Sequence, residues 1–259
     1  MFRMLFAMSV FALSPADTCT AAEPEAKEFK ADGKTLLYRI MKPTDVEAGK
    51  KYPLVVMLHG AGERGKDNSK QLVWFWNAKN PSPMTRPEVA AAKAFVVVPQ
   101  CPDGKQWVNV PWAKGSYKTP EVSEPLKLTL DLTDSLLKEL PIDPDRVSVI
   151  GMSMGGYGAL DAVQRRPELF AAVVPICGAG DPSKAKDIAH IAMWAFHGAD
   201  DTVVPASGSR EIVEDVKKAG GSPKYTEYPK TGHNSWSPAF AEKEFWDWVF
   251  AQKRTMPKK

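Results

Sequence analysis

The sequence of 259 residues predicts an α/β protein with a mostly parallel central sheet of about eight strands and helices on both faces. Several short runs are almost continuously apolar, as expected for strands that are buried on both faces. These runs cover residues 54–58, 94–98, 147–150, 171–176 and 191–196. Helical patterns lie between them, and strands that alternate with helices are typical of a parallel sheet.

The remaining elements follow from local patterns along the chain. Residues 28–41 alternate loosely around an Asp-Gly pair, which predicts one or two edge strands. Residues 224–228 also alternate and predict a strand near the opposite edge. Periodic apolar positions, several of them bounded by proline or glycine, predict the helices. These cover residues 126–140, 153–165, 209–219 and 240–252. The proline-containing stretches 80–87 and 104–120 predict surface loops.

Length and composition favour a single catalytic domain. A chain of 259 residues can bury a full core, and a net charge of +3 with scattered basic residues does not indicate nucleic-acid binding. Residues 1–22 place one positive charge ahead of a short apolar run, which predicts a cleaved signal peptide and a secreted or periplasmic catalytic domain at residues 23–259. The apolar run is too short for a transmembrane helix, which takes about 20 residues. Lipid attachment at Cys19 is the alternative, and residues 16–18 disfavour it.

The stretch at 145–160 predicts a strand, a sharp turn and a helix. A β-branched run meets Gly151-Met152-Ser153-Met154-Gly155, which has the pattern G-x-S-x-G. Glycine is needed at both flanks because a tight turn leaves no room for a Cβ there, and the strained turn lifts the serine hydroxyl clear of the sheet. A simple Gly/Ser loop is the alternative, but strand, turn and helix occur in the required order. We therefore expect Ser153 to be a nucleophile.

A glycine-rich stretch follows the first buried strand. Gly60, Gly62 and Gly65 have the spacing of a dinucleotide-binding motif, but the second strand and the acidic residue that would hold the ribose are not in place. The stretch also fits part of a nucleotide phosphate-binding loop, yet Asp67 stands where Ser or Thr would bind Mg²⁺. We therefore expect the glycines to let a backbone N–H approach a reacting carbonyl, as one half of an oxyanion hole.

Ser153 needs a base, because a serine hydroxyl is a weak nucleophile at neutral pH. Where such a serine follows a strand in a sharp turn, the acid and then the histidine come later in the chain. This order excludes His59, while His190 and His197 precede any acid of the following loop and are expected to be structural. His233 follows the last strand and is left as the base. For the acid, chain order alone does not choose among Asp181, Asp200 and Asp201.

The sequence resembles the α/β-hydrolase superfamily, and is most similar to its secreted bacterial carboxylesterases of the dienelactone-hydrolase and prolyl-oligopeptidase-like branch. The motifs that carry the resemblance span nearly the whole mature chain. They are residues 59–65, 151–156, 197–205 and 232–236. The resemblance implies an α/β-hydrolase fold, and it does not carry a substrate over, because members of this branch differ in their loops.

The resemblance also implies roles for individual residues. Ser153 is the nucleophile, His233 the base and Asp201 the acid, since Asp201 holds the acid position of the H-G-x-x-D-x-x-V-P pattern. The backbone N–H groups of Ala61 and Met154 are the oxyanion donors. No metal and no cofactor is expected, because acyl transfer by such a triad requires neither.

These features predict an exported serine esterase that acts on a small-molecule or carbohydrate ester through an acyl-enzyme, with carbohydrate-linked and phenolic esters as candidate substrates. The first alternative is a serine peptidase of the prolyl-oligopeptidase-like branch. Such peptidases usually carry a large additional domain, for which 259 residues leave no room. The second alternative is a non-catalytic binding protein on the same scaffold, which the presence of every triad residue disfavours.

Three tryptophans are candidates for substrate binding. Trp236 lies three positions after His233 and is expected to form a wall of the substrate pocket. Trp107 and Trp112 lie on a loop after a central strand and are weaker candidates. Packing in the core is the alternative for each of these rings, because tryptophans are mostly buried.

The cysteines after residue 22 are expected to be free thiols. Cys101 and Cys177 each follow a central strand, and in the usual strand order of the resembling fold two strands lie between them. Three strand spacings amount to roughly 14 Å. A disulfide tolerates Cα separations only up to about 7 Å.

Overall fold

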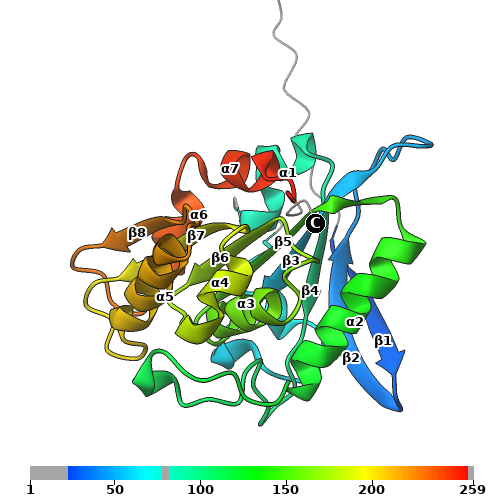
Figure 1. Ribbon diagram of the computed structural model, residues 1–259. Coiled ribbons are helices and arrows are strands. Elements are labelled where there is room, and N and C mark those ends of the chain that lie inside the picture. Colours follow the sequence, from blue (N-terminus) through cyan, green and yellow to red (C-terminus); the bar gives the residue numbers. More distant parts are fainter. Residues whose placement is uncertain (1–22, 78–81, 256–259) are drawn as a thin grey trace, which may run out of the picture.

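The computed structural model describes residues 23–77 and 82–255 (Figure 1). The strands of the described part form one eight-stranded sheet in the order β1-β2-β4-β3-β5-β6-β7-β8, which confirms the predicted fold class. They are β1 (Glu25–Ala31), β2 (Lys34–Met41), β3 (Tyr52–Leu58), β4 (Phe95–Pro99), β5 (Ile142–Met152), β6 (Ala172–Ile176), β7 (Ala192–Gly198) and β8 (Lys224–Tyr228). The α-helices are α1 (Pro87–Ala91), α2 (Glu124–Glu139), α3 (Met154–Arg165), α4 (Ala185–Ile188), α5 (Ala206–Lys218), α6 (Trp236–Ala241) and α7 (Phe245–Ala251).

Strand direction brings the loops of interest to one edge of the sheet. From β4 through β3 and β5 to β8, all neighbouring strands are parallel, whereas β1 and β2 are antiparallel to their neighbours. The carboxyl ends of the parallel strands therefore meet at the same edge, which is where open α/β sheets place their ligands. Ser153 follows β5, Asp201 lies in the loop after β7, and His233 lies in the loop after β8.

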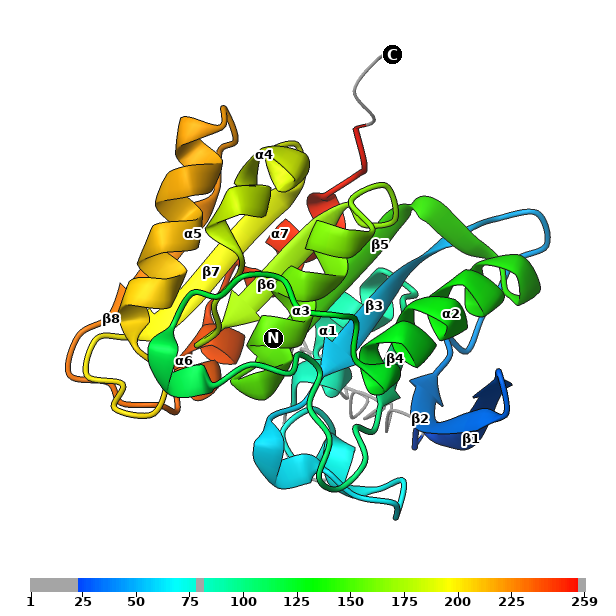
Figure 2. The same ribbon diagram turned by 60° about the horizontal axis from the view of Figure 1, so that its bottom comes forward.

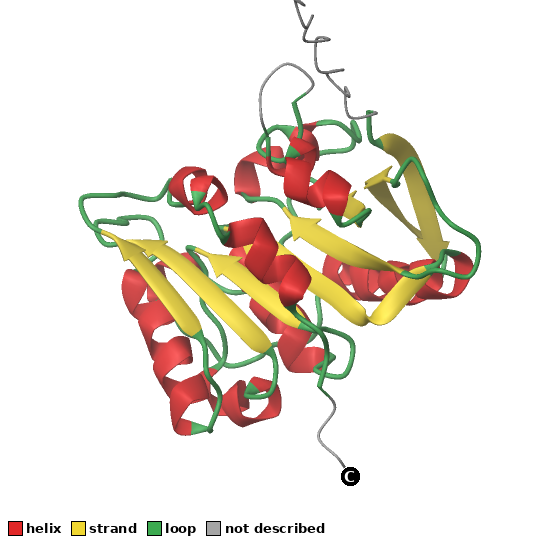
Figure 3. Ribbon diagram, turned by 90° about the horizontal axis from the view of Figure 1, so that it is seen from above, coloured by secondary structure: helices red, strands yellow, loops and turns green. Residues whose placement is uncertain are grey.

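Helices cover both faces of the sheet. Helices α2, α3, α4 and α5 lie on one face, and α1, α6 and α7 lie on the other (Figures 2 and 3). Strand β3 shows why its whole sequence is apolar. Its residues Leu54, Val56 and Leu58 join the apolar cluster under α2 and α3, while Val55 and Met57 join the cluster under α1, α6 and α7. Since side chains alternate between faces, every position of a covered strand must be apolar.

The structure corrects the prediction of one helix at 240–252. The helix is broken after Ala241, because Glu242 adopts a non-helical conformation (φ −57°, ψ 128°) and accepts a hydrogen bond from the Tyr228 hydroxyl at 2.8 Å. The break lets Phe240 and Phe245 pack edge to face, with ring centroids 5.4 Å apart. Two short 3₁₀ helices, Pro83–Thr85 and Trp112–Lys114, lie in the stretches predicted as loops, and α1 begins at the last residue of the first stretch, since one or two turns give no periodic signal.

The prediction of free thiols is confirmed. Cys101 and Cys177 are buried and unbridged, and β3 and β5 lie between the strands that they follow. The predicted signal peptide at residues 1–22, with Cys19, lies outside the described residues. Within the described ranges, none of the helices combines the length and apolar character that a membrane span requires.

Candidate active site

Ser153 sits on a strained turn between β5 and α3. Its backbone has φ 54° and ψ −121°, a conformation that non-glycine residues rarely adopt and that is sustained only where the surroundings enforce it. The flanking glycines explain how the turn closes. A Cβ on Gly151 would lie 1.9 Å from the Gly155 carbonyl oxygen, and one on Gly155 would lie 2.0 Å from the Leu58 carbonyl oxygen. Only glycine fits at either position.

This close packing predicts a large stability effect. Gly155→Ala forces a methyl group into the β3 backbone, which cannot move without disturbing the sheet, so we expect a loss of at least about 3 kcal/mol in the free energy of unfolding. Gly62→Ala is the matched control, because a Cβ there meets no heavy atom within 4 Å. Urea unfolding of both variants measures the difference. Equal midpoints for the two variants would contradict the packing argument.

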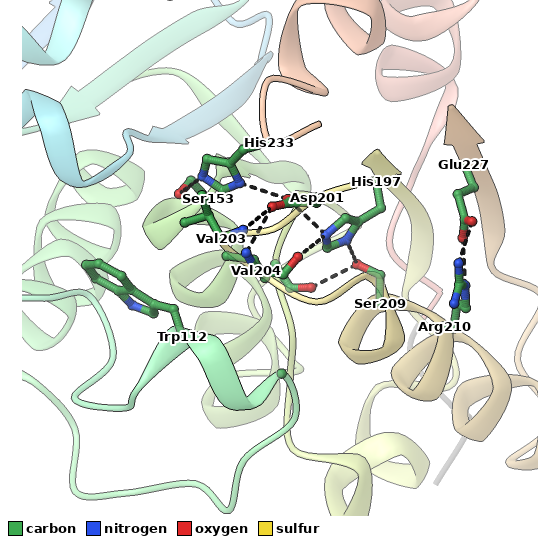
Figure 4. A network of polar contacts seen from close by, with 12 residues as sticks. Trp112, Ser153, His197, Asp201, Val203, Val204, Ser209, Arg210, Glu227 and His233 are labelled. Atoms are coloured by element: carbon green, nitrogen blue, oxygen red, sulfur yellow. Dashed lines mark hydrogen bonds and ion pairs between the residues drawn. The ribbon is translucent and has the colours of Figure 1, made fainter. Parts of the chain in front are cut away.

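Ser153, His233 and Asp201 form a continuous chain of hydrogen bonds (Figure 4). Ser153 Oγ lies 2.8 Å from His233 Nε2, and His233 Nδ1 lies 2.8 Å from Asp201 Oδ2. Asp201 Oδ1 accepts the backbone N–H groups of Val203 and Val204, each at 2.9 Å. Burial acts to raise the pKa of Asp201, but the hydrogen bonds from His233 and from these N–H groups outweigh it, so the pKa lies below its ordinary value. The acid is therefore ionised at neutral pH.

The other two candidate acids do not contact the histidine. Asp181 caps the short 3₁₀ helix Pro182–Lys184, where its carboxylate accepts the Ser183 N–H at 3.0 Å and the Thr119 N–H at 2.7 Å. Asp200 is exposed, and its backbone N–H donates a hydrogen bond to the Thr231 carbonyl. Of the three aspartates that chain order allows, Asp201 is the one within hydrogen-bond distance of His233.

The backbone groups expected as oxyanion donors both start helices. Ala61 is the first residue of the 3₁₀ helix Ala61–Glu63, and Met154 is the first residue of α3. The N–H groups at the start of a helix have no partner within that helix. Both starts lie close to Ser153, since a Cβ built on Gly60 would be 3.6 Å from Ser153 Cβ and Met154 directly follows Ser153. Two N–H groups without an intrahelical partner therefore lie near the nucleophile.

His59 and Trp107 support the backbone at the first of these helix starts. The buried His59 ring contacts the Gly60 carbonyl through Nδ1 at 2.6 Å and accepts the Cys101 N–H at Nε2, at 2.9 Å. Burial lowers the pKa of His59 to about 4, so the ring is neutral and Nδ1 carries its proton. Trp107 Nε1–H donates to the His59 carbonyl at 3.0 Å. Both rings thus hold residues 59–61 in place.

Comparison with known proteins supplies the family. The profile of the phospholipase/carboxylesterase family matches residues 43–244. The chain belongs to this family, within the α/β-hydrolase superfamily. A solved structure described as a thermostable esterase is 38% identical, with a TM-score of 0.81, and the match covers 91% of this chain and 64% of that one.

Two curated relatives share less sequence identity with this chain. "Putative esterase NocK" of Nocardia uniformis subsp. tsuyamanensis is 24% identical over 78% of this chain and 56% of its own length. Dipeptidyl peptidase 8 of Mus musculus is 27% identical over 67% of this chain and 17% of its own length. The chain therefore spans little more than half of the first relative and a small part of the second.

For this family member, the structure places two of the three predicted tryptophans near the candidate site. The Trp236 ring packs edge to face on His233, with centroids 5.5 Å apart. Trp112 is partly exposed, and its carbonyl accepts the hydroxyl of Tyr157 at 2.9 Å, which holds it beside the first turn of α3. Trp107 lies in the core instead. Its exposed fraction is 0%, so it presents no surface to a substrate, and we correct that expectation.

A cavity of about 250 Å³ adjoins Trp236. Trp74, Arg86 and Phe240 also line it, and the Trp74 ring packs edge to face on Trp236 at 5.5 Å. Trp74 is 39% exposed, and its Nε1–H donates to Glu63, the last residue of the 3₁₀ helix Ala61–Glu63. Reasoning from sequence missed Trp74, and the one signal for it is an aromatic run at 74–76 in a polar stretch.

Cys177 lies close to the acid and the base. A ligand atom of each of Cys177, Asp201 and His233 lies within 4.8 Å of the others, and the described residues contain no other such group of three or more. Burial raises the pKa of the Cys177 thiol to about 12, so it stays protonated and is a poor metal ligand. The other two residues are hydrogen bonded to each other. Their donor set suits proton transfer better than metal binding.

Proposed function

We propose that this protein is an exported serine esterase that cleaves carboxylic esters through a Ser153-His233-Asp201 triad. The observation that carries the proposal is the unbroken chain of hydrogen bonds from Ser153 to Asp201, at the end of a strained turn and beside free N–H groups. A nucleophile, a base, an orienting acid and oxyanion donors in mutual reach are the parts that acyl transfer requires.

The first half of the reaction forms an acyl-enzyme. Ser153 Oγ attacks the carbonyl carbon of the ester while His233 Nε2 takes the hydroxyl proton. The charge that develops on the carbonyl oxygen is stabilised by the N–H groups of Ala61 and Met154. His233 then passes its proton to the alcohol oxygen as the ester bond breaks, and the alcohol leaves. The Ser153 ester of the acid remains.

The second half returns the enzyme to its starting state. His233 removes a proton from a water molecule, whose oxygen attacks the acyl carbon on Ser153. The same N–H groups stabilise the second tetrahedral intermediate, and His233 returns the proton to Ser153 Oγ as the acid leaves. Asp201 stays ionised throughout, holds Nδ1–H of His233 and stabilises the imidazolium that forms in each half.

The substrate that we propose is a carbohydrate-linked or phenolic ester. His233 protonates the leaving alcohol, so the alcohol part of the substrate lies on the His233 side of Ser153. Trp236 packs on His233 and borders the cavity shared with Trp74. Aromatic walls of this kind suit ring-shaped groups, whether sugar or phenol.

A serine peptidase is the second candidate, supported by the similarity to dipeptidyl peptidase 8. Hydrolysis of nitrophenyl esters of increasing acyl length, acetylated xylan, feruloyl esters and peptide amides by the purified protein separates the two. We expect turnover of esters and none of peptide amides. Cleavage of amides with no cleavage of esters would overturn the esterase proposal.

Trp236→Ala tests the proposed wall of the pocket. We expect KM to rise about tenfold for aryl and sugar esters, and much less for ethyl acetate, because a lost aromatic contact costs about 0.5–1.5 kcal/mol beyond its buried area. Trp248→Ala, on α7, is the matched control for stability, since this ring packs on Trp194 instead. An equal rise in KM for all esters, with a melting temperature lowered as much as in the control, would favour a packing role.

Export rests on residues 1–22, whose charged start and apolar run suit a signal peptide. Amino-terminal sequencing of the protein recovered from the periplasm or the medium of an expressing bacterium tests it. We expect cleavage near residue 22. Recovery of the uncleaved chain from the cytoplasm alone would overturn this part of the proposal.

A further inference from the structure

A second imidazole contacts the carboxylate of the triad acid. His197 is the last residue but one of β7, and its side chain is fully buried. Its Nε2 lies 3.3 Å from Asp201 Oδ2, the same oxygen that His233 Nδ1 approaches to 2.8 Å (Figure 4). The position of His197 before Asp201 in the chain excludes it as the base, so this contact needs another explanation.

The neighbours of His197 determine where one of its protons sits. Nε2 faces two acceptors, the Val204 carbonyl oxygen at 3.0 Å and Asp201 Oδ2 at 3.3 Å. Nδ1 lies 2.7 Å from Ser209 Oγ, which itself lies 2.8 Å from the Gly178 carbonyl oxygen. The hydroxyl proton of Ser209 can serve either neighbour. Whichever it serves, Nε2 must be protonated, because an unprotonated nitrogen would face two oxygens that have no proton to offer.

The carboxylate of Asp201 is thus held on both oxygens. Oδ1 accepts the N–H groups of Val203 and Val204, while Oδ2 accepts from His233 Nδ1 and lies 3.3 Å from His197 Nε2. His197 Nε2–H approaches Oδ2 from within the core, since His197 is buried and His233 retains a side-chain exposure of 22%. This direction restrains rotation of the carboxylate and keeps Oδ2 in line with His233 Nδ1.

We propose that His197 is a positioning residue of the triad, whose Nε2–H orients the Asp201 carboxylate toward His233 and limits its basicity. The proposal rests on the proposed catalytic role of Asp201 and His233. Each hydrogen bond to a carboxylate favours its ionised form, so losing this donor makes Asp201 more basic. A more basic Asp201 stabilises protonated His233 more strongly. A carboxylate that rotates more freely also orients the neutral His233 ring less well.

The groups that act on this pair besides His233 are few. Cys177 and Tyr157 lie near Asp201, and both are protonated at neutral pH because burial raises their pKa values. Glu227 faces His197 from β8 and is paired with Arg210, Oε1 to Nη2 at 2.6 Å. Since these groups keep their charge between pH 5 and 8, a change of the pH profile in this range reports on the triad.

Two substitutions separate the two nitrogens of His197. The amide nitrogen of Gln reaches the place of ring Nε2, so His197→Gln keeps a donor toward Asp201. The amide nitrogen of Asn reaches the place of Nδ1, so His197→Asn keeps a polar contact with Ser209 and loses the donor to Asp201. Both variants bury an amide, which makes them matched for desolvation.

We expect His197→Asn to lower kcat for nitrophenyl butyrate by about tenfold to a hundredfold, with KM changed less than about twofold, since a lost hydrogen bond to a charged group has an effect of that size. The acid limb of its plot of kcat/KM against pH should shift to higher pH by about half a unit, because protonation of the base is favoured. His197→Gln recovers kcat to within about threefold of the wild type and restores the acid limb.

Melting temperatures of both variants separate positioning from folding. Equal losses of kcat in the two variants, losses that follow the melting temperature, or an unmoved acid limb in His197→Asn would each overturn the proposal. Wild-type kcat in His197→Asn would do so as well. The proposed function fails separately, through ester hydrolysis that persists in Ser153→Ala.

Discussion

We expect Ser153→Ala to abolish ester hydrolysis and to leave the fold intact. In comparable triads the loss of the nucleophile lowers kcat on the order of 10⁶-fold, because no covalent intermediate can form. The fold survives because the substitution removes only a hydroxyl, and the backbone turn is held by other contacts. Among them, the Ser153 N–H donates to the Ile176 carbonyl at 2.8 Å. Rates of nitrophenyl ester hydrolysis measure the loss, and circular dichroism checks the fold.

Covalent labelling identifies the nucleophile directly. An organophosphonate should label Ser153 in the wild type and should not label Ser153→Ala, as peptide mapping by mass spectrometry would show. Ser148→Ala is the matched control, since Ser148 is also buried and lies on β5 away from its carboxyl end. It should retain both labelling and kcat. Labelling at any other residue would refute the assignment of the nucleophile.

The sheet could be predicted because its covered strands carry an unambiguous signal. Strand β3 is apolar at every position, and its residues divide between the clusters on the two faces of the sheet. Strand β5 begins earlier than its apolar run, because Ile142 already pairs with Tyr52. The Asp-Pro-Asp segment that follows Ile142 is typical of a turn, so the sequence did not predict this part of the strand. The break between α6 and α7 was not predictable either, because it depends on the long-range contact of Glu242 with Tyr228.

The candidate site could be predicted as far as chain order and turn chemistry reach. Glycine spacing points to Ser153, and order leaves His233 as its base. Chain order does not indicate which tryptophan ring on a loop packs into the core and which one lines the site. Trp107 is buried, and its indole N–H donates to the His59 carbonyl. Trp74 lies next to the site because it contacts Trp236 and Glu63, which belong to other elements of the fold. These placements are set by tertiary contacts, for which the sequence carries no local pattern.

Asp201→Asn should lower kcat by about 10⁴-fold, the size of effect expected when the base loses its correct tautomer. The structure explains why the amide cannot substitute. The N–H groups of Val203 and Val204 at Oδ1 require an acceptor there, so the amide oxygen takes that place and the amide NH₂ takes the place of Oδ2. The NH₂ then faces His233 Nδ1, which must lose its proton. The proton moves to Nε2, which can no longer accept one from Ser153.

The neighbouring aspartates provide the controls. Asp200→Asn, one residue away and exposed, should keep kcat within about twofold, since surface substitutions have small effects. Asp181→Asn should lower the melting temperature and change kcat little, because that carboxylate caps a helix and accepts hydrogen bonds from Thr119 and Ser183. Nuclear magnetic resonance of His233 should detect the exchanged tautomer in Asp201→Asn. If Asp181→Asn proved to be the inactive variant and Asp201→Asn retained kcat, the acid would be the carboxylate that follows β6.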